Sequence, residues 1–330
     1  MSDFANANFL KTNSQVSSIG ECLSSGIFNI QRLGTHNGGN RALRIWVVIA
    51  TVGRASLLRQ TLARLPLQTR APDGILVVGS SPEDIEGAEE ACDGVQAILS
   101  EKGLCRQRNR ALERLREESD VVVFFDDDFL PEAHYLETLV ELFDADPELV
   151  GLTGLLYADG AHTGQIAFAD ATEMLARDIR QPVNDEHDCD WLYGCNMAFR
   201  TSATTGLSFD EALPLYGWQE DVDFSNQVAR RGKMIRSNAL TGIHLGTRGG
   251  RQSGLKLGYS QVANIIYLLR KGTIGRWHGV SLMTRNILAN CVKCVRPEPE
   301  IDRRGRLAGN LLAAGDLLRG RVTPERIELL

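Results

Sequence analysis

Three consecutive acidic residues, Asp126, Asp127 and Asp128, follow the apolar run at 121–125. A β-branched run of this length predicts a buried strand, so the carboxylates come where that strand ends. Carboxylates held this close repel one another unless a positive charge lies among them. Mg²⁺ and Mn²⁺ prefer carboxylate oxygens and often complete their coordination with substrate phosphates. We interpret the triplet as a metal site; the alternative is a solvated acidic turn that caps the helix expected after Pro131.

The elements that position the triplet follow from two earlier apolar runs, IWVVIA at 45–50 and ILVV at 75–78. Helical spacing of leucines follows the first run, and a helix is predicted over 104–115, ahead of the third strand. Alternating strands and helices predict crossover connections and a parallel sheet. Ligands bind beyond the carboxyl ends of such strands, where Thr51, Gly79 and Asp126 fall. We expect these three residues to line one crevice.

The later part of the chain is less regular. A helix is expected from Pro131 to about Phe143, and another from Asp221 to Arg231, followed by a short edge strand at 234–236. Between them, residues 149–215 mix short strands with Gly, Thr and Asp, a composition that favours a substrate-binding region over a packed repeat.

Composition excludes several classes of function. The 330 residues carry a formal net charge of −6, which argues against binding to a nucleic-acid backbone. The first 40 residues lack the pattern of a secretory signal, and no apolar run approaches the roughly 20 residues that cross a bilayer. Seven scattered cysteines fit reduced thiols. We expect a soluble cytoplasmic protein, or one peripheral at the inner face of a membrane.

Residues 251–306 differ in charge, with eleven Lys or Arg against three acids. An apolar stripe lies in this segment and consists of Val262, Ile265, Ile266, Leu268 and Leu269. A stripe of this kind with charged flanks is the ordinary pattern of a helix that caps a core or forms a dimer interface, which we favour. The alternative is contact with an anionic membrane or with a lipid-linked diphosphate acceptor.

Six segments, taken together and in order, resemble the family 2 glycosyltransferases, inverting enzymes with the type A glycosyltransferase fold, over roughly residues 44–250. Each is weak alone, but their order and spacing are specific. The segments are VIATVGR at 48–54, ILVVGSS at 75–81, GLCRQRN at 103–109, FDDD at 125–128, GCNMAFR at 194–200 and WQEDVD at 218–223.

The resemblance implies a donor side that binds a nucleoside-diphosphate sugar with Mn²⁺ or Mg²⁺. Asp128 would be a direct metal ligand, Asp126 would lie near the ribose or a metal-bound water, and His244 would be either a third ligand or a structural histidine. The remaining residues implied for the donor are Ala50, Thr51, Arg54, Gly79, Arg108, Asn109 and Asp127. One departure concerns the nucleotide base, because Gly79 stands where the family usually has an acid, and Asp84 is a possible substitute.

The acceptor side is implied in the same way. Asp221, at a helix start, would be the base that takes the proton of the acceptor hydroxyl, with Glu220 and Asp223 as rivals for that role. Glu220 and Asn196 would contact the acceptor. Trp191 and Trp218 would stack on a sugar ring, although core packing explains either tryptophan equally well.

The predicted organisation is an extension at 1–40, a catalytic domain at 41–250 and a basic helical extension at 251–330. Within the catalytic domain, 41–130 would bind the nucleotide sugar and 131–250 the acceptor. The predicted activity is a hexosyl or related transfer to a glycan or lipid-linked acceptor, in surface polysaccharide or glycolipid synthesis. Two alternatives stay open: a non-catalytic sugar-nucleotide or glycan-binding protein on the same fold, and a sugar-phosphate nucleotidyltransferase.

Overall fold

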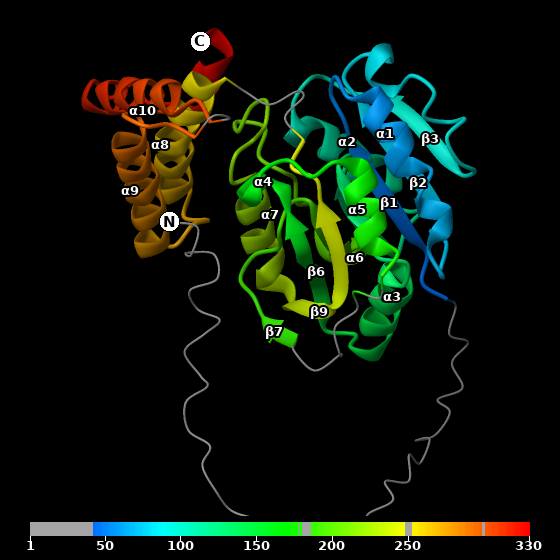
Figure 1. Ribbon diagram of the computed structural model, residues 1–330. Coiled ribbons are helices and arrows are strands. Elements are labelled where there is room, and N and C mark those ends of the chain that lie inside the picture. The colour runs from blue at the N-terminus through cyan, green and yellow to red at the C-terminus, as the bar shows by residue number, and fades with distance from the viewer. Residues whose placement is uncertain (1–41, 178, 180–185, 248–252, 299–300) are drawn as a thin grey trace, which may run out of the picture. The chain divides into compact units, whose positions relative to one another are not determined.

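The protein is described here by a computed structural model of residues 42–177, 179, 186–247, 253–298 and 301–330 (Figure 1). The predicted extension at 1–40 lies outside these residues.

One half of the central sheet is parallel, as expected. Its strands are β1 (Ile45–Ala50), β2 (Gly74–Gly79), β3 (Val95–Leu99) and β4 (Val121–Asp126), in the order β3-β2-β1-β4. The three predicted strands are therefore confirmed, and β3 joins them at the edge. Ala50 pairs with both Val78 and Asp126, so the ends of β1, β2 and β4 are level with one another.

The other half of the sheet is mixed. After β4 come β8 (Asn196–Arg200), β6 (Leu149–Asp159), β9 (Lys233–His244) and β5 (Phe129–Pro131), while β7 (Glu186–Asp188) also pairs with β9. The prediction of a short edge strand at 234–236 was wrong in both the length and the position of the strand. β9 runs for 12 residues between β6 and β5, and because most of these residues are buried, its sequence lacks the apolar and polar alternation that would mark a long strand.

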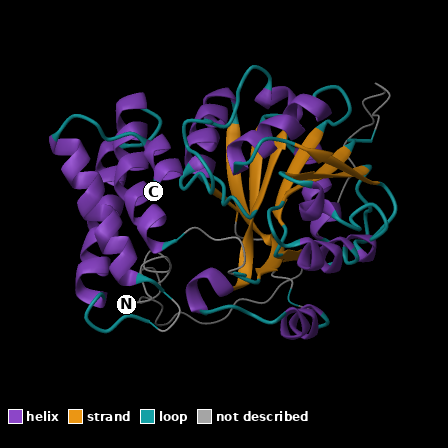
Figure 2. Cartoon of the chain, turned by 90° about the horizontal axis from the view of Figure 1, so that it is seen from above, coloured by secondary structure: helices purple, strands orange, loops and turns teal. Residues whose placement is uncertain are grey.

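Apolar side chains of β1 alternate between two buried layers, because successive residues of a strand face opposite sides. Ile45, Val47 and Ile49 pack under α1 (Ala55–Leu62) and α3 (Tyr135–Ala145). Trp46 and Val48 pack under α2 (Leu104–Leu115) and α7 (Glu220–Val228). The sheet is thus covered by helices on both faces (Figure 2), which confirms the predicted α/β class.

The helices α1, α2, α3 and α7 match the predicted ones closely, with α7 continuing into a 3-10 turn, η3 (Ala229–Arg231). Three further helices follow β6 and β8: α4 (Gly160–Thr163), α5 (Phe168–Leu175) and α6 (Thr201–Thr204). Short 3-10 turns are also formed by η1 (Leu65–Leu67) and η2 (Pro82–Ile85).

The carboxyl-terminal segment is helical, as predicted, and consists of α8 (Gly254–Lys271), α9 (Arg276–Lys293), α10 (Arg303–Leu318) and the turn η4 (Pro324–Leu329). Its predicted apolar stripe lies on α8 and is largely buried. Ile265 and Leu268 belong to the same core cluster as Phe199 and Phe224 of the sheet domain. α8 therefore acts as a cap on the core, the interpretation favoured from the sequence. Within the described residues, no helix is long and apolar enough to span a membrane.

Candidate active site

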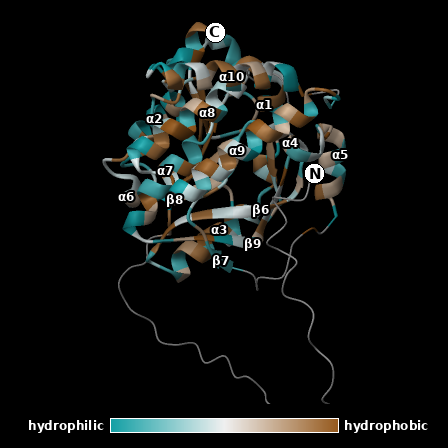
Figure 3. Ribbon diagram, turned by 90° about the vertical axis from the view of Figure 1, so that its left-hand side faces the viewer, coloured by the Kyte–Doolittle hydropathy of each residue, from teal (hydrophilic) through white to brown (hydrophobic). Residues whose placement is uncertain are grey.

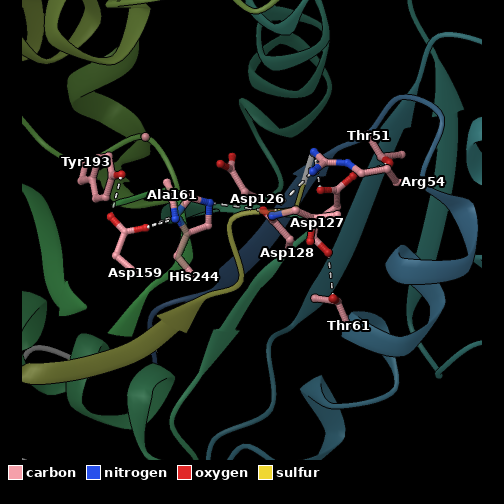
Figure 4. A network of polar contacts seen from close by, with 12 residues as sticks. Thr51, Arg54, Thr61, Asp126, Asp127, Asp128, Asp159, Ala161, Tyr193 and His244 are labelled. Carbon is pink, nitrogen blue, oxygen red and sulfur yellow. Dashed lines mark hydrogen bonds and ion pairs between the residues drawn. The ribbon is translucent and has the colours of Figure 1, made fainter. Parts of the chain in front are cut away.

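The loop after β1 is held against the aspartate triplet by polar contacts (Figure 4). The Thr51 hydroxyl donates to Asp127 Oδ2 at 2.7 Å, and Arg54 Nη2 lies 2.6 Å from Asp127 Oδ1. Thr61 Oγ1, on α1, donates to the Asp127 carbonyl at 2.8 Å. Asp127 is fully buried, and that burial raises its pKa to about 7 despite the opposing charge of Arg54. Its side chain therefore fixes the loop after β1.

The flanking aspartates meet a histidine from a distant strand. One ligand atom from each of Asp126, Asp128 and His244 lies within 4.8 Å of the others. The sheet explains this approach, because His244 ends β9 directly opposite Phe129 of β5, the residue after Asp128. His244 Nε2 is 3.4 Å from Asp128 Oδ1.

His244 is held from its other side by Asp159, the last residue of β6, whose Oδ1 lies 2.8 Å from His244 Nδ1. Burial alone would lower the pKa of His244, but the Asp128 and Asp159 carboxylates together raise it to about 10. Asp159 also accepts a hydrogen bond at 3.2 Å from the hydroxyl of Tyr193, whose ring meets the imidazole edge to face. Neither Asp159 nor Tyr193 was singled out from the sequence. The role of Asp159 follows from the parallel register of β6 and β9, which sets Asp159 opposite His244.

The three aspartates have different surroundings. Burial would raise the pKa of Asp128, but His244, Arg54 and a 2.7 Å hydrogen bond from the Thr247 amide hold it below its ordinary value. Asp126 has the most exposed side chain of the three, at 29%. Partial burial still removes water from its carboxylate, and this desolvation raises its pKa. Two carboxylates and an imidazole form a donor set that suits Mn²⁺, so these residues fit a divalent cation.

Arg108 connects this cluster to the start of α7. Its guanidinium is buried, pairs with Asp126 and Glu220, and donates at 2.8 Å to the Gly194 carbonyl. It also lies over the rings of Phe124 and Phe209, so its position is fixed by packing as well as by charge. Burial raises the pKa of Glu220, partly offset by Arg108.

Asp221 lies at the beginning of α7, beside Gly194. Its Oδ2 accepts from the Gly194 amide at 3.1 Å and its Oδ1 from the amide of Val222 at 2.9 Å. The side chain is half-buried, and this burial raises its pKa. Three successive contacts, through Gly194 and Arg108, connect it to Asp126.

The rival carboxylate of Asp223 has other partners. It is fully buried, its Oδ2 accepts from Lys271 Nζ at 2.7 Å and from Gln227, and its Oδ1 accepts from Thr273. Both oxygens are therefore engaged in joining α7 to the end of α8.

The loop after β2 is organised by Asp84. Its carboxylate accepts from the amides of Gly53 at 2.6 Å, Ser80 at 2.9 Å and Ser81 at 2.9 Å, and these bonds hold its pKa below the ordinary value although burial opposes them. Asp84 thus ties the loop after β1 to the loop after β2. Gly79 is required there, because a Cβ would lie 2.6 Å from Ile85 Cγ2.

Gln107, which was not predicted from the sequence, forms hydrogen bonds at the ends of the same two strands. Gln107 Nε2, on α2, donates to the carbonyls of Thr51 at 2.9 Å and Val78 at 2.7 Å, at the ends of β1 and β2.

The other predicted site residues contact different parts of the protein. The amide of Asn109 exchanges hydrogen bonds with Phe209 and reaches Glu211. Asn196 is buried on β8, where its Oδ1 accepts from Thr153. Trp191 is half-buried under the guanidinium of Arg236, and Trp218 packs partly against the core with its carbonyl bonded to Asn264.

Many solved structures are similar to this chain, and three of them are described here. GalNAc-T7 with UDP, GalNAc and Mn²⁺ is 16% identical, with 70% of this chain and 51% of that chain covered and a TM-score of 0.49. The mannosyltransferase PcManGT from Pyrobaculum calidifontis, in complex with GDP-Man and Mn²⁺, is 16% identical, with 84% and 81% covered and a TM-score of 0.46. A mycobacterial protein is 17% identical, with 71% and 76% covered and a TM-score of 0.46. The chain spans about half the length of the first.

Among curated proteins, none matches this chain. A family model does match, the one described as Glycosyl transferase family 2, over residues 46–205. This range holds Asp126, Asp128 and Arg108, whereas Asp221 and His244 lie beyond it and are joined to it by the sheet and by Gly194. The match agrees with the α/β sheet and the helices that follow it, and the predicted type A glycosyltransferase fold is confirmed. The predicted resemblance to glycosyl transferase family 2 is thus confirmed over residues 46–205.

Proposed function

We propose that the protein is an inverting, metal-dependent glycosyltransferase that moves a sugar from a nucleoside-diphosphate sugar to a hydroxyl of a glycan or lipid-linked acceptor. The observation that carries the proposal is the approach of Asp126, Asp128 and His244 to within 4.8 Å of one another at the carboxyl edge of the sheet. The resemblance to family 2 favours a role in surface polysaccharide or glycolipid synthesis.

Asp126, Asp128 and His244 would hold the cation. Asp159 supports this role for His244, because a carboxylate at Nδ1 fixes the tautomer that offers Nε2 to a metal. The imidazole favours Mn²⁺ over Mg²⁺ in this site. When bound, a divalent cation neutralises the donor diphosphate and makes it a better leaving group.

Asp221 is the proposed base. Direct displacement needs a carboxylate that takes the proton of the attacking hydroxyl, and Asp221 is held ready by the Gly194 and Val222 amides. Arg108 keeps Asp126 and Glu220 in place on either side of Gly194. Asp223 is fully buried and its charge is paired with Lys271, whereas Asp221 is only half-buried, so Asp221 is the better placed of the two.

The experiment is steady-state release of nucleoside diphosphate from a panel of sugar nucleotides, with Mn²⁺, Mg²⁺ or a chelator. Asp221→Asn should lower kcat by about 10²- to 10⁴-fold, the usual contribution of a general base, while donor affinity stays unchanged. Asp170→Asn is the matched control, since Asp170 is an exposed acid in the first turn of α5. Normal turnover by Asp221→Asn would show that Asp221 is not the catalytic base. Donor binding without turnover on a broad acceptor panel would instead favour a non-catalytic binding protein.

A further inference from the structure

Helix α9 presents an apolar stripe to solvent. The exposed fractions are 89% for Trp277, 44% for Val280, 57% for Leu288, 66% for Val292 and 75% for Val295, which follows directly after the helix. Trp277, Val280, Leu288 and Val292 are separated by three, eight and four residues, which places them on one face of the helix, and together with Val295 they are called the α9 stripe. Figure 3 views the molecule from the side on which α8, α9 and α10 lie.

The opposite face of α9 is already packed. Gly279 and Asn290 are buried, and a Cβ at Gly279 would lie 3.1 Å from Leu269 Cδ2 of α8. Leu282 and Met283 pack against the core cluster that contains Ile265, while the Asn290 amide donates to Gln261 of α8 at 2.9 Å. The inner face of α9 therefore holds the helix against α8, and the exposed stripe does not take part in this packing.

The charge around the stripe is of one sign. Residues 253–297 contain seven Lys or Arg and neither Asp nor Glu, in a chain whose net charge is −6. Lys271 and Lys293 pair with acids outside this stretch. Two exposed arginines, Arg276 and Arg296, border the stripe.

We propose that the α9 stripe docks on an anionic phospholipid bilayer, with α9 lying in the plane of the headgroups. Exposed tryptophan and aliphatic side chains flanked by arginines form the pattern of an interfacial helix, in which the apolar face enters the acyl boundary and the basic residues meet lipid phosphates. The contact would be peripheral, because no described helix can cross a bilayer.

Charge favours lipid over a second copy of the chain. A symmetric dimer through the stripe would set the same patch of each copy face to face. Arg276 and Arg296 would then meet their counterparts, and residues 253–297 of the second copy contain no acidic residue to face them. Lipid phosphates supply negative charge to this face, whereas the same face of a second copy would supply positive charge.

The test is co-sedimentation of the full chain with vesicles of phosphatidylcholine alone or mixed with phosphatidylglycerol. The chain should sediment with the mixed vesicles only, and added salt should release it, because screening weakens the attraction. Combining Trp277→Ser with Leu288→Ser should weaken binding by about tenfold or more, since it removes the largest apolar groups of the stripe. Combining Arg276→Gln with Arg296→Gln should raise the phosphatidylglycerol content needed for binding.

Leu67→Ser is the matched control, because Leu67 is 59% exposed on η1 and should bind like the unchanged chain. All the substituted residues are exposed, so thermal unfolding should be unaffected in every variant. Equal binding by the Trp277→Ser, Leu288→Ser variant, or no binding to mixed vesicles, would overturn the proposal. A concentration-dependent dimer lost in the same variant would assign the stripe to a second copy. The readout does not depend on turnover, so its outcome is separate from that of the proposed transferase activity.

Discussion

The imidazole of His244 lies between two carboxylates, with Asp128 facing Nε2 and Asp159 bonded to Nδ1. The first contact would belong to the metal site and the second orients the ring. Residues that orient a histidine ligand usually affect metal affinity nearly as much as the ligand itself does. Asp159 is therefore a positioning residue whose effect is measurable without any substrate.

Asp159→Asn should weaken Mn²⁺ binding to the protein by about 10- to 100-fold, because the amide is a poorer acceptor for the Nδ1 proton. Titration of free Mn²⁺ by electron paramagnetic resonance measures this affinity directly. Asp144→Asn, at an exposed acid near the end of α3, serves as the control. Unchanged Mn²⁺ affinity in Asp159→Asn would show that the imidazole does not depend on this carboxylate.

Helices α8 and α10 lie close together at two glycines, Gly258 of α8 and Gly309 of α10. A Cβ at Gly258 would lie 2.0 Å from the Arg306 carbonyl oxygen, and one at Gly309 would lie 2.1 Å from the Leu255 oxygen. Both obstacles are backbone atoms, so neither can rotate out of the way. The spacing of the two helices therefore depends on glycine at these positions.

Gly258→Ala should destabilise the protein by about 1 to 3 kcal/mol, the usual cost of overpacking, as measured by urea unfolding. Gly275→Ala is the control, because no atom lies within 4 Å of its Cβ position and its φ of −63° suits alanine. If both variants unfold at the same urea concentration, the close approach of α8 and α10 is not a source of stability.

Elements whose signal is local were predictable from the sequence. Apolar runs predicted β1, β2 and β4, and periodic leucines predicted α3. The prediction of β4 in turn placed Asp126 and Asp128 at the edge of the sheet. The long strand β9 was not predictable, because its pairing with β6 is irregular and joins residues far apart in the chain. Asp159 became visible only through that pairing, which brings it opposite His244, 85 residues away.

For the molecule as a whole, the carboxyl-terminal helices are connected to the start of α7 by charge. Lys271 lies at the end of α8 and bonds both Asp210 and the buried Asp223, two residues after Asp221. Asn264 adds a hydrogen bond from α8 to the carbonyl of Trp218. The predicted boundary at 250 stays a prediction, but the chain on either side of it shares buried contacts.

Lys271→Met should destabilise the protein by roughly 3 kcal/mol or more, because it leaves the buried Asp223 carboxylate without its cation. The double variant with Asp223→Asn should recover part of that loss, which a double-mutant cycle from urea unfolding would measure. Strict additivity of the two single effects would show that Lys271 and Asp223 do not act as a pair.

Arg108 has a consequence for how the two substrates influence each other. Its single positive charge is shared between Asp126, on the side predicted for the donor, and Glu220, on the side predicted for the acceptor. A cation bound at Asp126 would compete with Arg108 for that carboxylate, and the guanidinium would then interact more strongly with Glu220. Occupancy of one side thus alters the electrostatic field on the other, and thermodynamic linkage requires the same coupling in the opposite direction.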